Sequence, residues 1–175
     1  MLDKYEGKVA TPDDLTPLAQ SYLGMSKDVV DGRLDYDWPL AGSQLRIELL
    51  SAEDRRIRFF IDVYEGRRES TVLLGAIPQR KATSQSRAAS MPYVRIDMAD
   101  DPETLRHVNP DGSVVVGDHA HLDLNGYGIK WALPLDAQDV IRPVDGVYTI
   151  QSMFESMLDV NNVTKLLRVK YGLGV

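Results

Sequence analysis

The chain has 175 residues and no cysteine. Disulfide bonds, zinc sites built on thiolates and catalysis by a cysteine nucleophile are therefore excluded. No apolar run approaches the ~20 residues of a membrane-spanning helix, and the polar residues Met1 to Glu6 do not resemble a signal peptide. Glycine-rich phosphate loops and the Gly-x-Ser-x-Gly nucleophile motif are absent as well. We expect a cytoplasmic protein with no membrane partner and no cofactor.

Charge is distributed unevenly along the chain, whose net charge is −6. Residues 1–54 hold 11 acidic and 5 basic residues, whereas residues 55–95 hold 9 basic and 3 acidic residues. Residues 96–175 are acidic again, with 12 acidic and 6 basic residues. The basic segment is either the solvent face of strands or a docking surface for RNA or an acidic protein. An acidic chain binds nucleic acid poorly outside such a surface.

Two helices are predicted from apolar periodicity. Thr11 caps the first, followed by Pro12 and two carboxylates in the first turn. Its apolar stripe is expected to consist of Leu15, Leu18, Ala19, Tyr22 and Leu23, and Gly24 is the expected end. A second stripe near the end of the chain consists of Ile150, Met153, Phe154, Met157 and Leu158.

Between the helices the pattern changes to the alternation that is typical of strands. Residues 44–50 and 56–64 predict an antiparallel pair; further strands are predicted at residues 70–77, 93–98, 113–116, 119–124 and 127–133. Residues 79–92 are polar and rich in serine and alanine, and we expect a loop or a short helix there. The chain is therefore predicted to be a single α+β domain over residues 1–175. Its sheet should be mostly antiparallel, with an N-terminal helix and a C-terminal helix packed on it.

All three histidines, His107, His119 and His121, lie within 15 positions of the chain. Alternate side chains of a strand point to the same side, so His119 and His121 should project from one face. Asp123 would join them if the strand stays regular. Two imidazoles at this spacing can chelate a metal ion. They can also make only structural hydrogen bonds, just as Arg95 and Asp97 can simply pair with each other.

Imidazoles titrate near neutral pH, which suits proton transfer in the metal-independent cleavage of RNA. His119 and His121 would act as acid and base, with His107 as a third candidate. The phosphate charge would be stabilised by a cation from the set Arg95, Lys130 and Arg87.

Several spaced motifs in residues 85–132 resemble those of a family of uncharacterised bacterial proteins. They are Arg95-Ile96-Asp97, the turn Asn-Pro-Asp-Gly at residues 109–112, His119-Ala120-His121, and Gly-Tyr-Gly-Ile-Lys-Trp-Ala at residues 126–132. The chain has Asp118 where the family tends to have a hydroxyl residue, and Asn125 where it tends to have an acidic one. The resemblance implies a small bacterial or phage-associated protein with no established activity. It also groups Asp97, Asn109 and Tyr127 with the histidines as supporting residues.

The leading hypothesis is a small nucleic-acid-directed enzyme, a metal-independent endoribonuclease of toxin or phage-defence type. The alternative is a non-catalytic acidic protein, such as an antitoxin or a DNA-mimicking inhibitor of a nucleic-acid-binding complex. Its acidic segments would engage a basic protein partner. RNA cleavage separates the two.

Overall fold

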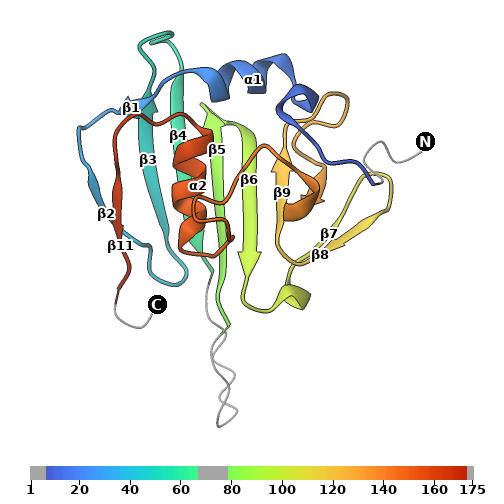
Figure 1. The fold of residues 1–175 in the computed structure, drawn as a ribbon. Coiled ribbons are helices and arrows are strands. Elements are labelled where there is room, and N and C mark those ends of the chain that lie inside the picture. Colours follow the sequence, from blue (N-terminus) through green and yellow to red (C-terminus); the bar gives the residue numbers. More distant parts are fainter. Residues whose placement is uncertain (1–6, 67–78, 173–175) are drawn as a thin grey trace.

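The computed structural model describes residues 7–66 and 79–172. Within these residues, one antiparallel sheet has the strand order β1-β3-β4-β5-β6-β9-β10 (Figure 1). Its strands are β1 (Asp28–Val29), β3 (Gln44–Leu50), β4 (Arg58–Glu65), β5 (Lys81–Ala88), β6 (Met91–Ala99), β9 (His119–Leu122) and β10 (Ala132–Pro134). The predicted α+β domain with a mostly antiparallel sheet is confirmed.

Two smaller pairs of strands flank this sheet. Strands β2 (Asp35–Asp37) and β11 (Arg168–Lys170) are parallel, and β7 (Arg106–Val108) and β8 (Val114–Val116) form an antiparallel hairpin. The helices are α1 (Pro17–Gly24) and α2 (Ser152–Val160), with short 3-10 turns at Pro12–Asp14, Pro102–Thr104 and Leu135–Ala137. Neither described helix is long and apolar enough to cross a membrane.

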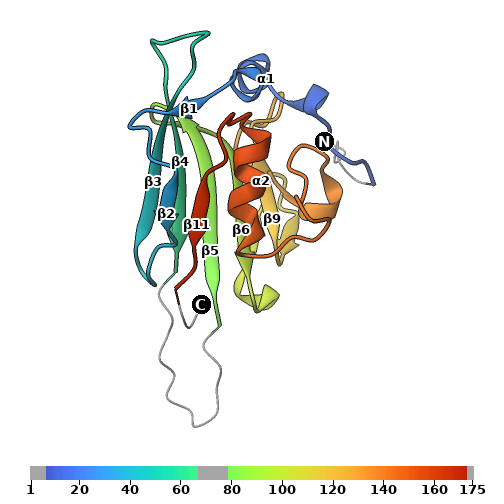
Figure 2. The same ribbon diagram turned by 60° about the vertical axis from the view of Figure 1, so that its left-hand side comes forward.

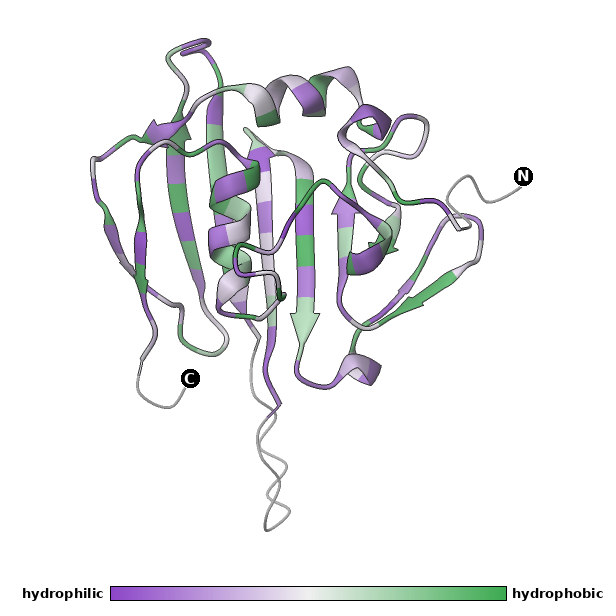
Figure 3. Cartoon of the chain, in the orientation of Figure 1, coloured by the Kyte–Doolittle hydropathy of each residue, from purple (hydrophilic) through white to green (hydrophobic). Residues whose placement is uncertain are grey.

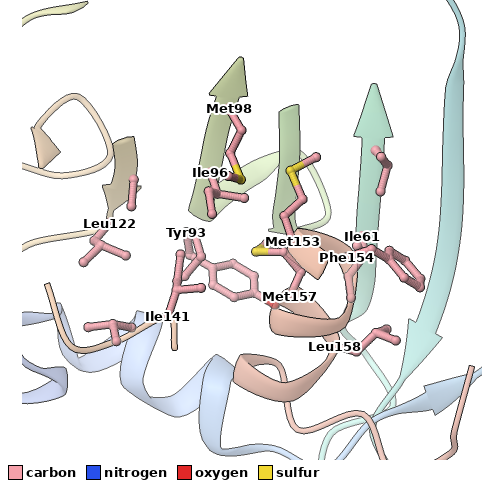
Figure 4. Close-up of a cluster of buried hydrophobic side chains, with 14 of the residues drawn as sticks. Ile61, Tyr93, Ile96, Met98, Leu122, Ile141, Met153, Phe154, Met157 and Leu158 are labelled. Carbon is pink, nitrogen blue, oxygen red and sulfur yellow. The ribbon is translucent and has the colours of Figure 1, made fainter. Parts of the chain in front are cut away.

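Helix α2 lies against one face of the sheet, as the two ribbon views show (Figures 1 and 2). Met153, Phe154 and Met157 of α2 are buried against side chains of the sheet such as Ile61 and Ile96 (Figure 4). Full burial of a side chain of this size contributes roughly 1.5–3 kcal/mol. The predicted C-terminal helical stripe is therefore confirmed as core.

The prediction of a loop or short helix at residues 79–92 is wrong, because residues 81–88 form the central strand β5. Every second side chain of β5 is small and buried on the side of α2, namely Ala82, Ser84, Ser86 and Ala88. Small side chains let the helix approach the sheet closely. The Ser86 hydroxyl accepts a hydrogen bond from Asn161 at the end of α2, so this hydroxyl keeps a hydrogen-bond partner although it is buried. Serine and alanine here reflect close packing rather than a loop.

The first helix begins at Pro17 and not after Thr11. Thr16 caps it by accepting a hydrogen bond from the amide of Ala19, whereas Thr11 caps only a 3-10 turn. Leu18, predicted to be part of the apolar stripe, is 45% exposed. Ala19 is buried, and the helix ends at Gly24 as predicted.

The returning strand predicted at residues 127–133 is also too long. Backbone amides of Tyr127 and Gly128 both donate to the carbonyl of Leu124, which holds this stretch in a turn. Pairing with β9 begins only at Ala132. The strand predicted at residues 70–77 lies outside the described residues.

A buried lysine joins the ends of the two helices. Lys27 is 1% exposed, and its ammonium group donates to the carbonyls of Tyr22, Met25 and Asn161. Met25 and Asn161 are the C-terminal caps of α1 and α2. A cation at this point satisfies carbonyls at the negative ends of both helix dipoles.

The face of the sheet turned away from α2 is polar, and the alternation of hydrophobic and hydrophilic residues is visible along the strands (Figure 3). Strand pairing places its members in rows that cross the sheet. We call it the open face; it carries Arg46, Arg58, Phe60, Asp62, Tyr64, Lys81, Thr83, Gln85, Arg87, Arg95, Asp97, His119 and His121. Neither described helix covers this face.

Candidate functional site

Strand register brings the polar residues of β6 and β9 together at one end of the open face. Arg95 lies opposite His121 and Asp97 lies opposite His119. On the other side of β6, Thr83 of β5 lies opposite Asp97. These five side chains therefore occupy adjacent positions on three neighbouring strands.

The third histidine, His107, lies on the β7–β8 hairpin. The ring centroid of His107 lies 4.6 Å from that of His121 and 5.9 Å from that of His119, and the latter two are 5.2 Å apart. The Nε2 of His107 lies 3.1 Å from the carbonyl oxygen of Lys130 and donates to it, since a carbonyl only accepts. The three rings thus form one cluster.

Asp97 lies at the centre of the cluster and is 3% exposed. Its Oδ1 accepts hydrogen bonds from the Thr83 hydroxyl at 2.5 Å and from Nη2 of Arg95 at 2.9 Å. Its Oδ2 lies 2.8 Å from Nε of Arg95, 3.5 Å from Nε2 of His119 and 3.7 Å from Nε2 of His121. Within the described residues, this buried oxygen has no aligned hydrogen-bond donor.

Backbone carbonyls fix the tautomers of the two buried histidines. Nδ1 of His119 lies 2.7 Å from the carbonyl oxygen of Gly117, and Nδ1 of His121 lies 3.0 Å from that of Ile129. Each Nδ1 must therefore carry the proton and donate it, which leaves a lone pair on Nε2 of the neutral ring. Both lone pairs face the carboxylate of Asp97.

The pKa of His121 is lowered to about 4, chiefly because the ring is buried; the negative charge of Asp97 opposes this lowering and the positive charge of Arg95 adds to it. His121 is consequently neutral at pH 7. No proton then lies between His121 and Asp97, so the lone pair on Nε2 of His121 faces a carboxylate oxygen. The guanidinium of Arg95, 2.8 Å from this oxygen, offsets part of the repulsion, and a cation between the ring nitrogens and Asp97 would offset the rest.

Asp97, His119 and His121 can supply three donor atoms that lie within 4.8 Å of one another. Two imidazole nitrogens and one carboxylate oxygen are a common donor set for divalent transition metals. Donation of the other ring N–H to a backbone carbonyl is the arrangement usual for metal-bound histidines. The three residues are therefore suited to hold one divalent cation.

The cluster lines a cavity of about 480 Å³ that opens on the open face. Cations from three elements line its wall: Lys81, Arg95 and Arg106. Tyr64 and Thr83 line it as well. A volume of this size accommodates a small anionic group next to the three histidines.

The structure places the other predicted site residues elsewhere. Arg87 donates to Asp62 at 2.6 Å and lies over the ring of Phe60, outside the cavity lining. Lys130 contributes its carbonyl to His107, and its side chain does not line the cavity. Trp131 packs against the ring of Tyr127, with centroids 4.6 Å apart.

Two further polar residues near the histidines in the sequence are structural. The side-chain amide of Asn109 bonds both the N–H and the C=O of Ala132, which ties the β7–β8 hairpin to β10. Asp123 accepts a hydrogen bond from the Thr16 hydroxyl at 2.7 Å, so it links β9 to the start of α1. Neither lines the cavity.

Sequence patterns missed Thr83, Tyr64 and Arg106 as members of the site. Thr83 lies in the segment predicted as a loop, although the alternation of small residues at positions 82, 84, 86 and 88 indicates a strand that would have placed it beside Asp97. No local signal points to Tyr64 or Arg106, because the tertiary fold alone brings them to the cavity.

No curated protein and no solved structure matches the chain. A family model does match residues 17–163, which include every residue of the cluster. The chain therefore belongs to the family of unknown function DUF6978.

Proposed function

We propose that the chain is a metal-dependent hydrolase with one divalent ion bound by Asp97, His119 and His121. The convergence of the Asp97 Oδ2 and the two Nε2 atoms is the observation that carries the proposal. All three groups are buried, so leaving them without a cation between them costs free energy.

Three protein ligands leave coordination positions open for water and substrate. An ion held by these residues would lower the pKa of a bound water and would supply a hydroxide nucleophile at neutral pH. Arg95 and Arg106, which line the cavity, would hold the anionic part of the substrate. His107 lines the cavity beside His121 and is the candidate to protonate the leaving group.

Metal-independent cleavage of RNA by His119 and His121 stays a prediction and uses the same residues. The low pKa of His121 favours the metal, because a ring that is neutral at pH 7 is a poor acid and a good ligand. The non-catalytic binding protein also stays a prediction. It is the outcome to expect if the purified chain neither retains metal nor hydrolyses any ester.

The test is metal content and phosphodiesterase activity in the same sample. Chelator-treated protein is titrated with Mn²⁺, Fe²⁺, Co²⁺ and Zn²⁺, and hydrolysis of bis(p-nitrophenyl) phosphate is followed. We expect one ion per chain and metal-dependent hydrolysis, both lost in Asp97→Asn and in His119→Gln. Glu65→Gln is the matched control, because Glu65 is equally buried and also paired with an arginine, but does not line the cavity.

Two results would overturn the proposal. One is a chain that retains none of the four ions at micromolar concentration. The other is hydrolysis that persists in excess chelator and is lost in His119→Gln, which would restore the acid–base mechanism.

A further inference from the structure

We propose that the open face binds single-stranded nucleic acid and that its phosphodiester backbone is the substrate class of the metal centre. The cleavage half of this proposal rests on the proposed function. The binding half rests on the open face alone.

Charge on this face is opposite to that of the whole chain. Strand pairing also places Asp28 and Glu48 on this face. Together with Arg106 at the rim of the cavity, its cations are Arg46, Arg58, Lys81, Arg87 and Arg95, and its carboxylates are Asp28, Glu48, Asp62 and Asp97. Six cations against four carboxylates give a local charge of +2 on a chain whose net charge is −6. The rest of the chain therefore repels a polyanion and the open face attracts it.

Three arginines of this face reach solvent. The side chains of Arg46 and Arg58 are 50% and 52% exposed, although each is paired with a carboxylate of a neighbouring strand. Arg95 is 42% exposed and paired with Asp97. Of these pairs, Arg58–Glu48 is exposed on both sides, at 52% and 41%. Such exposed pairs contribute little to stability, so the guanidinium of Arg58 can exchange its carboxylate for a phosphate at low cost. Arg46 and Arg95 are paired with more buried carboxylates and present their exposed N–H groups to a phosphate.

One row across the sheet leads from these cations to the cluster. Strand pairing aligns Arg46, Asp62, Gln85, Arg95 and His121 on five consecutive strands. Neighbouring strands lie about 4.8 Å apart, so the row is roughly 19 Å long. A single-stranded nucleic acid bound along this row would pass its phosphodiester backbone over Arg95 and into the cavity beside Asp97.

Aromatic rings on the same face favour a nucleic acid over an acidic peptide. Tyr64 is 43% exposed and lines the cavity, in the row that contains Thr83 and Asp97. Phe60 lies beneath the guanidinium of Arg87, 4.2 Å from ring centroid to Cζ, so a planar cation covers this ring. Unpaired bases stack on exposed aromatic and guanidinium planes, and an acidic peptide has no corresponding group.

The chemical step is a hydrolysis and needs no other reactant. Water adds to the phosphorus, the bond from phosphorus to one ester oxygen breaks, and that oxygen takes up the proton that the water loses. His107 is the group placed to carry this proton.

Binding is tested with fluorescein-labelled 12-mer RNA and DNA single strands, in chelator so that no cleavage occurs. We expect the affinity of the wild-type chain to fall as salt rises. The double variant Arg46→Gln/Arg58→Gln should bind at least tenfold more weakly, and its slope of log affinity against log salt should be shallower by about 1.4. Arg142→Gln is the matched control, because it removes an exposed arginine that is paired with Asp139 and is not on the sheet.

Tyr64→Ala gives a second and independent readout. Loss of one stacked base should weaken binding about tenfold and leave the salt slope unchanged, since no charge is removed. The binding half is overturned if neither oligonucleotide binds at 50 mM salt, if Arg142→Gln weakens binding as much as the double variant, or if poly-glutamate competes as well as RNA.

The two proposals fail separately. Metal content is measured without nucleic acid, and nucleic-acid binding is measured without metal. If the oligonucleotides bind and metal does not, the open face is a binding surface and the hydrolase proposal is wrong. If the loaded protein hydrolyses bis(p-nitrophenyl) phosphate but leaves both bound oligonucleotides intact, the substrate class is wrong and the metal centre stands.

Discussion

Replacement of Lys27 by methionine tests the link between the two helices. Methionine has a similar length and fills the same space, but it cannot donate to the carbonyls of Tyr22, Met25 and Asn161. The variant therefore leaves three largely buried acceptors without this donor while the apolar packing stays nearly constant.

Two opposing contributions set the change in the free energy of unfolding that Lys27→Met causes at pH 7. An unsatisfied buried acceptor costs about 1–3 kcal/mol, so three of them cost roughly 6 kcal/mol. Burial lowers the pKa of Lys27 to about 8 from 10.5, and the methionine variant is relieved of this cost of about 3 kcal/mol. The net loss in the free energy of unfolding is about 3 kcal/mol, or a fall in Tm of roughly 6–12 °C for a domain of this size.

The pKa also fixes the sign of the pH dependence. Between pH 8 and pH 10.5 the unfolded chain keeps the Lys27 proton that the folded chain has lost. The contribution of Lys27 to the free energy of unfolding therefore rises with pH in this window, and it is smallest below pH 8. The difference between wild type and Lys27→Met should widen above pH 8.

Urea denaturation at pH 7, 8, 9 and 10 measures both effects. Lys165→Met is the control; Lys165 is 50% exposed and paired with Asp28, and its loss should change the free energy of unfolding by less than about 0.5 kcal/mol. A loss below 1 kcal/mol in Lys27→Met at pH 7 would refute the role of the three carbonyls. A difference that narrows above pH 8 would show that these carbonyls raise the pKa instead.

Further predictions concern β5 and the cluster. Ser84→Ala should raise the free energy of unfolding by up to about 1 kcal/mol, because the buried Ser84 hydroxyl has no hydrogen-bond partner within the described residues. Ser86→Ala should lower the free energy of unfolding by about 1–2 kcal/mol, because the hydrogen bond from Asn161 is lost. Denaturant titration of both variants measures these changes. Thr83→Val should weaken metal binding about 10–100-fold in a chelator competition, since the Asp97 carboxylate loses one of the bonds that orient it. His107→Gln should reduce the hydrolysis rate at least 100-fold while metal affinity changes less than tenfold.

Strong periodicity made part of the fold predictable. Residues 44–49 alternate between polar and apolar side chains, and the strand predicted at residues 44–50 has the bounds of β3. The stripe of Met153, Phe154 and Met157 likewise predicted α2, because all three are buried by one partner, the sheet. An element that is buried against one surface only has a clear apolar periodicity, so it can be predicted from the sequence.

Strand β5 was missed because its buried side chains are alanine and serine and not large apolar residues. Their small size allows α2 to pack closely on the strand. The start of α1 was misplaced because Thr11 and Thr16 both precede a proline and both cap, one a 3-10 turn and the other the helix. Local chemistry is the same at both positions. Only contacts with β9, such as the Thr16–Asp123 bond, distinguish them.

The alternation of side chains along a β-strand was enough to predict that His119 and His121 share a face. Their tautomers were not predictable, because the carbonyls of Gly117 and Ile129 that fix them lie in irregular segments. Arg87 was predicted as a phosphate ligand from its charge; on β5 it pairs with Asp62 outside the cavity lining, and its contact with phosphate stays a prediction. The case for a metal therefore comes from the orientation of ring nitrogens, which no sequence pattern reports.

A titration of the chelator-treated chain with Co²⁺, followed by visible absorption, tests the central claim most directly. We predict ligand-field bands that saturate at one Co²⁺ per chain and that are absent in Asp97→Asn but unchanged in Glu65→Gln. A spectrum identical to that of aqueous Co²⁺ throughout the titration would contradict the account, as would bands of equal intensity in Asp97→Asn.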